Sequence, residues 1–442
     1  MNAPVSIKTE AETGLAETFA AARPHLPGGP TVAAARAAAF AAFSASGLPH
    51  RRMEAWKYTD LRRLMRDAKP LAGAPDALAL DQAGTAGALL AGLDVRRLVV
   101  VNGTFVPELS DLADLEPGLA IRAMADALAA DNAVLNHGLG DLVPESEPAL
   151  ALNTALAGDG VVVTVAPGAR IERPLHLAFI ATGATATAMV TRSLVVIGAG
   201  ATASLIETHE GPGGCDYQVN TALQLVLGDG GQLDHAKIIQ EGGGALHLGT
   251  LLAHVGANAM FNAFAFTLGG LVVRNQMFVN LAGEGTQANI SGASLLAGKQ
   301  HGDTTLSIVH AAPGGQSREV FKAVVDESAR AVFQGKISVQ QAAQKTDARM
   351  MARALLLSPD AEADAKPELE IFADDVQCGH GATTGTLDEQ LKFYLQARGI
   401  PPKEAEALLI LAFVGEAMDG IAREGLRAAL ETATEAWLAA RD

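Results

Sequence analysis

Short apolar runs separated by glycines dominate the middle of the chain, from about residue 96 to residue 382. The stretches "GVVVTVAPGARIERPLHLAFIAT", "SLVVIGAGATASLIETHEG" and "LQLVLGDGGQLDHAKIIQE" alternate apolar with polar positions or are apolar over several residues. Runs of this length that are bounded by Gly are typical of β-strands. This part of the chain therefore predicts a domain built mainly of short strands.

Glycines recur at nearly regular intervals between these predicted strands, at Gly168, Gly200, Gly230, Gly256 and Gly285. Glycine suits sharp turns because it adopts positive φ at little cost. A recurrence of roughly 30 residues is typical of a solenoid whose coils cover one another. A β-sandwich also has short strands with glycine turns. The near-regular period and the long span of the region favour a β-helix.

The first part of the chain, about residues 1–95, has helical spacing and is rich in Ala and Arg. The stretch "TVAAARAAAFAAFSASG" favours a helix by propensity, and Gly47 and Pro49 then end it. In "MEAWKYTDLRRLMRDA" the apolar residues Trp56, Leu61 and Leu64 follow near helical spacing. These patterns predict an N-terminal helical domain.

The last part, about residues 383–442, also predicts helices. "TLDEQLKFYLQARG" offers Thr386 as an N-cap, with Asp388 and Glu389 in the first turn, and ends in Arg398 and Gly399, as helix ends prefer. "PPKEAEALLILAFVGEAMDG" begins with prolines, which the first turn of a helix tolerates. Its predicted stripe consists of Leu408, Leu409, Ala412, Phe413 and Glu416. Such a face either packs on its own domain or docks a partner.

Composition narrows the range of functions. Apolar residues make up 49% of the 442 residues and aromatic residues only 4%, so small aliphatic side chains must build a large core. The net charge of −16 argues against broad binding of a nucleic-acid backbone or of an anionic membrane. Two cysteines do not make a disulfide framework, and neither a secretory signal nor a transmembrane run is visible. We therefore expect a soluble cytoplasmic protein.

Familiar catalytic motifs are missing from the sequence. It has no GxxxxGK[ST] loop, so any role driven by ATP needs another subunit. "GAGATA" (198–203) lacks a following helix and a basic residue, which favours a plain turn. The histidines include His176, His209, His235, His247, His254, His301 and His310. They follow no metal-ligand spacing, so each is more often structural than a ligand.

Two weaker hypotheses remain for the central strands. "ETHEG" places Glu207 and His209 on one strand face, where they form either a carboxylate–imidazole metal pair or ordinary solvated polar residues. A β-helix with acidic clusters could also act on carbohydrate. The low aromatic content and the missing export signal disfavour that enzyme.

The stretch "EIFADDVQCGHGATTGTLDE" (370–389) holds the most specific candidate site. In a strand, Cys378 and His380 point to the same face. This pair suits a soft metal or a Cys/His nucleophile, or it is a buried cysteine beside a chance histidine. An iron–sulfur cluster usually takes four protein ligands, so the pair can be only part of such a site. A terminal strand can pair with a partner strand, which points to a site shared between two chains.

Several motifs resemble the SufB/SufD family of iron–sulfur cluster assembly proteins. They are "RAVFQGKISV" (330–339), "AQKTDARM" (343–350), "LLLSPDAEADAKPELEIFADDVQCGHGATTG" (355–385) and "LDEQLKFYLQARGI" (387–400). The resemblance covers most of the chain and is strongest over about 300–415. "EAWKYTDL" (54–61) is similar to the N-terminal signature of the SufD branch. Leu395 stands where the SufB branch carries a cysteine, which also makes the chain similar to SufD.

The resemblance implies a mainly β protein with a right-handed parallel β-helix core (96–382) between helical domains at 1–95 and 383–442. It implies a non-catalytic subunit that pairs with a SufB-like chain through the end of the β-helix and binds a SufC-like ABC ATPase at 386–416. ATP would act only through that ATPase. His380 matches the family's interface histidine, an expected ligand of iron or of a transient Fe–S cluster shared with the partner subunit, and Cys378 matches a cysteine close by. A homodimeric scaffold that uses two copies of His380 is the alternative.

Overall fold

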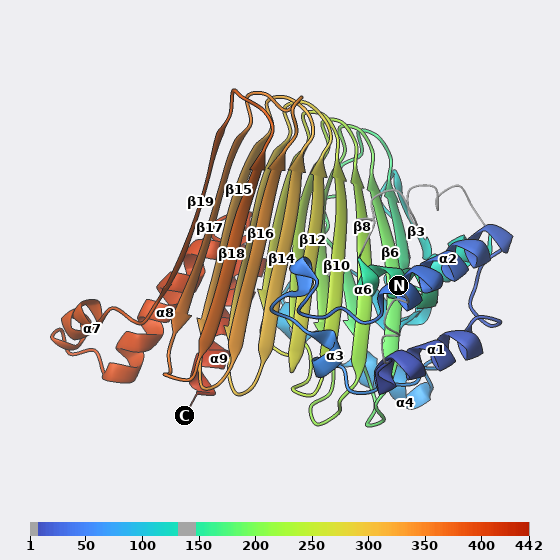
Figure 1. Ribbon diagram of the computed structural model, residues 1–442, viewed down its shortest axis with the longest axis horizontal. Coiled ribbons are helices and arrows are strands. Elements are labelled where there is room, and N and C mark those ends of the chain that lie inside the picture. The colour runs from blue at the N-terminus through green and yellow to red at the C-terminus, as the bar shows by residue number, and fades with distance from the viewer. Residues whose placement is uncertain (1–7, 131–146, 442) are drawn as a thin grey trace, which may run out of the picture.

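The computed structural model describes residues 8–130 and 147–441. Its core is a β-solenoid of about 8 turns over residues 162–385, with helices on either side (Figure 1). From one coil to the next, each coil adds one parallel strand to each of two sheets. The expected β-helix is confirmed. The β-sandwich alternative is wrong because each strand of the solenoid pairs in parallel with the next strand but one along the chain, as β10 does with β12 and β13 with β15.

The two sheets are named here A and B. Over residues 8–130 and 147–441, sheet A has nine strands and sheet B has ten. Sheet A contains β3 (Leu119–Ala123), β4 (Val161–Val165), β6 (Ala188–Ile197), β8 (Gln218–Leu227), β10 (Leu246–Val255), β12 (Val272–Leu281), β14 (His301–His310), β16 (Arg330–Val339) and β18 (Glu362–Ile371). Sheet B contains β1 (Arg96–Val101), β2 (Thr104–Phe105), β5 (Leu175–Ile180), β7 (Thr202–Glu210), β9 (Gln232–Gln240), β11 (Met260–Thr267), β13 (Gln287–Leu296), β15 (Gln316–Val325), β17 (Asp347–Leu356) and β19 (Gln377–Gly385).

One corner of the solenoid repeats a left-handed residue from coil to coil. The predicted turn glycines at 168, 200, 230 and 285 all have positive φ. Gly256 does not, and Asn258 takes the left-handed conformation in that coil instead. Asparagine tolerates this region better than most residues. Gly256 is needed for another reason, because a β-carbon there would lie 2.5 Å from an oxygen of Asp229. "GAGATA" is confirmed as a turn, between β6 and β7.

Side chains that alternate along the strands fill the space between the sheets. Leu205, Leu233 and Leu251 belong to one continuous core that runs from the first coil to the last. Residues of the opposite parity face outward and pack against the helices, as Leu248 does toward the N-terminal helices and Ile238 toward the C-terminal ones. This alternation is the period of two that a strand imposes.

The N-terminal helices lie against the outer face of sheet A (Figure 1). They are α1 (Glu10–Ala22), α2 (Pro30–Ser46), a short 3₁₀ turn at Glu54–Trp56 and α3 (Leu61–Leu64). Gly47 ends α2 as predicted, with positive φ. The helical spacing predicted for 53–68 gives only these two single turns, because Trp56 is drawn onto the sheet. Its ring lies 3.8 Å from the buried guanidinium of Arg274, and its Nε1 donates to Glu147 at 3.2 Å.

Helices also occur inside the region where the sequence pattern predicts strands. They are α5 (Met124–Ala129) and α6 (Pro148–Leu156), and α4 (Ala77–Gly84) precedes the first strand. Eight of the nine residues of α6 are buried, because this helix lies between α2 and sheet A. A helix that is buried on all sides is apolar on most of them. Its sequence therefore lacks the 3.6-residue alternation of apolar and polar positions by which a helix is told from a buried strand.

The C-terminal helices are α7 (Glu389–Gln396), α8 (Pro402–Met418) and α9 (Glu424–Ala439). Helices α8 and α9 cover the outer face of sheet B, and α7 projects from the body (Figure 1). Asp388 caps α7, where Thr386 was predicted. The predicted stripe of α8 is also wrong. The buried residues are instead Ala405, Ile410, Val414, Ala417 and Met418.

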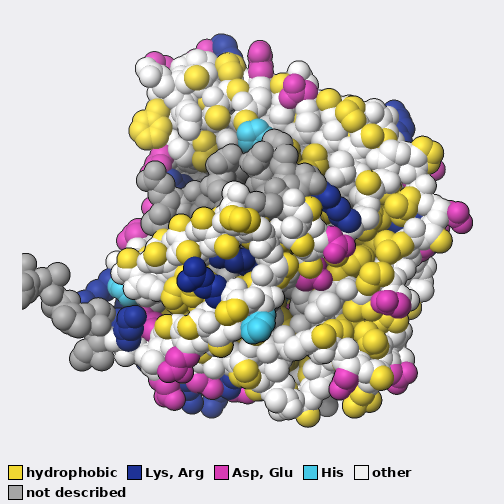
Figure 2. Space-filling model, turned by 90° about the vertical axis from the view of Figure 1, so that its right-hand side faces the viewer, with side chains coloured by type: hydrophobic (Ala, Val, Ile, Leu, Met, Phe, Trp, Pro, Cys, Tyr) yellow, Lys and Arg dark blue, Asp and Glu magenta, His cyan; other side chains and the backbone are white. Residues whose placement is uncertain are grey.

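The two ends of the solenoid differ. At the N-terminal end β2 and β3 pair antiparallel with β1 and β4, and each is the last strand of its sheet. At the C-terminal end the last strands, β18 and β19, are parallel to their neighbours, and each pairs along only one edge within the described residues. Figure 2 views the side of the N-terminal helices, where basic and acidic side chains are interspersed among apolar ones. In the part of the chain that is described, no helix is long and apolar enough to span a membrane.

Candidate functional site

Cys378 and His380 lie on β19, the last strand of sheet B. As the sequence predicts, they face the same side and line one hollow at the open end of the solenoid. Cys378 is half-buried and packs against the apolar core, whereas His380 is exposed. The chain's other cysteine, Cys215, is buried far back in the solenoid, and its Sγ lies 3.6 Å from the carbonyl oxygen of Ala184. The roles of Cys378 and His380 as ligands stay a prediction.

Neighbouring strands bring further side chains to this hollow. His380 pairs in register with Met350 on β17, which in turn pairs with Glu319 on β15. Glu319 therefore lies two strands from His380, or about 10 Å along the ladder. Arg318 and Arg349 line the same hollow. The open end thus combines a thiol, an imidazole, a thioether, a carboxyl group and two guanidinium groups.

Two of the residues that line the hollow, Arg318 and Arg349, are basic, although the whole chain is acidic. Burial raises the pKa of Glu319 to about 8, with a hydrogen bond from Ser317 and the charge of Arg318 acting in the opposite direction. This carboxyl group is therefore mostly protonated at neutral pH. Asp347 accepts a hydrogen bond from Arg318 at 2.7 Å and lies 3.5 Å from Arg349. In register the two arginines lie beside Gly379, at positions that alternate with those of Glu319, Cys378 and His380.

The thiol of Cys378 is not activated in the isolated chain. Burial raises its pKa, the backbone N–H of Ala348 lowers it, and the charge of Asp347 raises it further. Because the thiolate is the form that binds metals, a protonated thiol is a weak ligand until a cation arrives. His380, which is exposed, is the readier ligand of the two.

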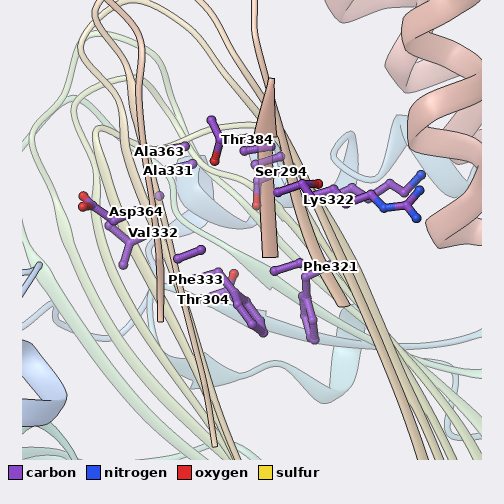
Figure 3. A pocket seen from close by; sticks show the side chains of 17 residues that line it. Ser294, Thr304, Phe321, Lys322, Ala331, Val332, Phe333, Ala363, Asp364 and Thr384 are labelled. Carbon is purple, nitrogen blue, oxygen red and sulfur yellow. The ribbon is translucent and has the colours of Figure 1, made fainter. Parts of the chain in front are cut away.

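A second cavity lies between the sheets near the same end, and Figure 3 shows the side chains that line it. Phe321 and Phe333 lie side by side there, with ring centroids 4.8 Å apart. Lys322 and Asp364, two of the three charged lining residues, point in opposite directions, away from these rings (Figure 3). Lys322 instead forms an ion pair with Glu416 of α8. This cavity is therefore apolar and offers no set of metal ligands among its described lining residues.

The pair in "ETHEG" is buried inside the solenoid, so the alternative of solvated polar residues is wrong. His209 Nε2 lies 2.6 Å from Glu207 Oε1, and Lys237 Nζ lies 3.3 Å from the same oxygen. His235 Nε2 is 3.3 Å from the other oxygen, Glu207 Oε2. Burial alone would raise the pKa of Glu207, but the charge of Lys237 and the hydrogen bonds of the two histidines hold it well below its ordinary value.

Glu241 and His247 extend this buried group. His247 Nδ1 lies 2.9 Å from Glu241 Oε1, and the hydroxyl of Tyr217 donates to Glu241 Oε2 at 2.6 Å. Burial lowers the pKa of His247 to about 4, with the hydrogen bond of Glu241 acting in the opposite direction. The imidazole is therefore neutral at pH 7. One ligand atom each from His209, Glu241 and His247 lie within 4.8 Å of one another.

Sequence analysis did not identify Arg318, Glu319 and Arg349 at the open end or Glu241 inside, and it took His247 as more often structural than a ligand. The spacing between successive coils is the sequence signal that could have identified the residues at the open end. In register, Cys378 lies beside Ala348 of the coil before it, and Ala348 lies beside Ser317 of the coil before that. The same period, applied strictly along the sequence, places positions 318–319 and 348–350 next to the Cys-x-His pair. The predicted glycine spacing was too irregular to fix that register.

Comparison with known proteins gives two profile matches that together cover residues 15–413. "SufBD protein N-terminal region" matches 15–177, and "SUF system FeS cluster assembly, SufBD core domain" matches 179–413. An iron–sulfur cluster assembly SufBD family protein of Synechocystis sp. is 33% identical over 392 residues, which cover 87% of this chain and 86% of the relative. The iron–sulfur cluster assembly protein SufD of Escherichia coli is 32% identical over 386 residues (86% and 87%). The SufD of Bacillus subtilis is 25% identical over 287 residues (64% and 65%).

Proposed function

Because the chain belongs to the SufBD family of the SUF system for iron–sulfur cluster assembly, we propose that it is a non-catalytic, SufD-type subunit of a cytoplasmic scaffold complex. In this complex a nascent cluster, or the iron for it, is held between this chain and a SufB-like subunit. The observation that carries the proposal is the position of His380. It is exposed on the last strand of the solenoid, beside a half-buried thiol.

The open end favours a partner strand. The free edge of β19 carries small and uncharged residues apart from His380, in the run "QCGHGATTG". Unpaired edges of this kind are templates for strand pairing. Strand β18 is different, since it carries charges and Pro367, which limit its use as a template. The exposed apolar residues Ile371 and Phe372 at the end of β18 add contact area for a partner.

The chemistry of the hollow fits a shared anionic cargo. His380 supplies one ligand, and Cys378 supplies a second after it loses its proton to a bound metal. The remaining ligands come from the partner, since a cluster usually takes four. Arg318 and Arg349 stabilise the negative charge that sulfide and thiolate bring. The chain would thus contribute some of the ligands of the site and some of the positive charge around it.

Replacing His380 with alanine is expected to leave the fold and the complex intact, because the side chain is exposed. Iron and sulfide bound per complex should fall by about tenfold or more, as for the loss of a metal ligand or its support. The complex is co-expressed with its SufB-like and SufC-like partners, purified without oxygen, and analysed for iron, sulfide and visible absorption. Cys378→Ala should have a smaller effect, since that thiol starts protonated.

The control is His254→Ala, which removes a half-buried histidine of β10 far from the open end. It should load iron like the wild type. Unchanged iron in the His380→Ala complex would remove this residue from the site. A chain that purifies as a homodimer and ignores a co-expressed SufB-like partner would favour the homodimeric scaffold instead.

We further propose that the ATPase subunit docks on α7 and the start of α8. Helix α7 has no buried residue, and three of its apolar side chains are exposed: Leu391 (52%), Phe393 (72%) and Tyr394 (53%). Leu408 of α8 is also exposed, at 42%. An aromatic cluster of this kind is typical of a docking hot spot. None of these four side chains belongs to the apolar core that α8 and α9 form with sheet B.

Replacing Phe393 with aspartate should therefore weaken binding of the SufC-like ATPase by at least about tenfold, the cost of losing a buried aromatic anchor. The measurement is titration calorimetry of the purified ATPase against the chain. Leu78→Asp is the matched control, because Leu78 of α4 is 64% exposed but lies on the N-terminal part. Equal affinities for both variants and the wild type would place the ATPase elsewhere.

A further inference from the structure

A group of polar side chains lies inside the solenoid, next to inward positions that are apolar. Along β7, Leu205 faces the core, and Glu207 and His209 follow on the same side. His247 lies on the inward side of β10, two positions before Gly249 and four before the core residue Leu251. Glu207, His209, Glu241 and His247 are all at most 5% exposed. Buried groups of this kind are costly unless they are satisfied.

Two ring nitrogens of the group have no hydrogen-bond partner among the described residues. They are His209 Nδ1 and His247 Nε2, and both are buried. An unpaired buried polar atom costs roughly 1 to 3 kcal/mol, so two in one cluster indicate something that completes it. Gly249 lies directly against this group, since a β-carbon there would lie 2.9 Å from His247 Nε2 and 2.5 Å from Lys237 Nζ.

The surrounding contacts orient these groups as they do around metal ligands. Glu207 accepts a hydrogen bond from the Nε2–H of His209, so Nδ1 of that ring is unprotonated and has a free lone pair. The Tyr217 hydroxyl and His247 fix the carboxylate of Glu241 from both sides. For His209 this contact with Glu207 has the usual arrangement around a metal-ligating histidine, whose second nitrogen donates to a carboxylate outside the site. In addition, the two carboxylates of the group outnumber its single ammonium, Lys237.

We propose that His209, His247 and Glu241 bind one divalent transition-metal ion, preferentially Zn²⁺, inside the solenoid. Two imidazoles and one carboxylate are a donor set that Zn²⁺ and neighbouring ions accept. The three ligand atoms lie within 4.8 Å of one another. In a tetrahedral site with bonds of about 2.0 to 2.1 Å such atoms are roughly 3.3 Å apart, so small rotations of the side chains would close the site.

This site is separate from the hollow at the open end and does not rest on the proposed function. Six strand steps separate β7 from β19 in sheet B, or about 29 Å. The ligands are also different in kind, because no cysteine takes part. Since His209 stacks on Phe179, with centroids 4.7 Å apart, and all three ligands are buried, the ion would enter during folding and exchange slowly.

The test is to express the full chain with Zn²⁺ in the medium, dialyse it against EDTA, and measure metal by mass spectrometry. We expect about one ion per chain in the wild type, and a loss of about tenfold or more in His209→Gln and His247→Gln. His310→Gln is the matched control, because His310 is also a fully buried histidine of the interior, bonded to Ser317. His310→Gln and His380→Ala should both keep the ion.

X-ray absorption at the zinc edge of the wild-type chain keeps the proposal testable if the glutamine variants fail to fold. The expected spectrum has nitrogen and oxygen neighbours with imidazole scattering and no sulfur. Zinc content far below one ion per chain in the wild type would overturn the proposal. So would a sulfur neighbour, or a folded His209→Gln or His247→Gln chain that keeps its zinc.

Discussion

Replacing Asp303 with asparagine is expected to lower the free energy of unfolding by about 3 to 5 kcal/mol, the cost of breaking a buried ion pair from one side. Asp303 is fully buried and accepts a 2.5 Å hydrogen bond from Arg274, which is 1% exposed. The same carboxylate accepts from Thr59. Without its charge, the guanidinium of Arg274 remains in the interior with no carboxylate in contact among the described residues. The segment around Trp56, which stacks on that guanidinium, would then detach first.

Tryptophan fluorescence during urea unfolding measures this effect. The chain has two tryptophans, so a Trp437→Phe background isolates the buried Trp56. The control is Asp375→Asn, which removes the charge of an exposed ion pair with Lys345 and should cost less than about 1 kcal/mol. If the Asp303 and Asp375 variants unfold at the same urea concentration, the buried pair does not hold the N-terminal segment.

Replacing Glu319 with glutamine is expected to stabilise the protein, and to do so more as the pH rises. The pKa of Glu319 is about 8 in the folded chain, against about 4.3 in an unfolded chain. A raised carboxyl pKa contributes stability that is present below the unfolded value and is lost as the pH rises toward the folded one. Glutamine removes this loss, so its advantage over the wild type should grow by about 4 kcal/mol between pH 5 and pH 9.

Thermal unfolding at a series of pH values between 5 and 9 checks the slope of that advantage. Glu284→Gln, in an exposed turn, should follow the wild type at every pH. A constant difference between the Glu319 variant and the wild type would mean that this carboxyl group ionises normally. In that case the hollow beside Cys378 would carry one more negative charge than we infer.

The general architecture could be predicted from the sequence because it depends on local patterns. Strand runs and turn glycines at 168, 200, 230 and 285 indicate coils, and Gly47 ends α2 because it takes a positive φ there and is followed closely by Pro49. Details that depend on tertiary packing could not be predicted. The predicted apolar stripe of α8 was wrong because the helix is apolar on most sides. Which side is buried therefore depends on how the helix packs against sheet B and does not follow from its own sequence pattern.

In the candidate site, too, local features could be predicted from the sequence and tertiary contacts could not. The same-face placement of Cys378 and His380 follows from a strand's period of two, and the need for a partner follows from counting ligands. Glu319 could not be identified, because its raised pKa comes from burial among coils that are distant in the sequence. The role of Trp56 is similar. "EAWKYTDL" reads as a helix, yet it is shaped by Arg274, which belongs to a strand much later in the chain.

The contrast between the two ends of the solenoid sets the size of the assemblies that this chain can form. A rod with a free parallel edge at both ends could add copies head to tail without limit and form fibres. Here the last strands at one end are the short antiparallel strands β2 and β3, so among the described residues the long parallel edges lie at the end of β18 and β19. When two such rods meet by their open ends, both edges are used and addition stops. From this contrast we expect assemblies of two solenoids joined by their open ends.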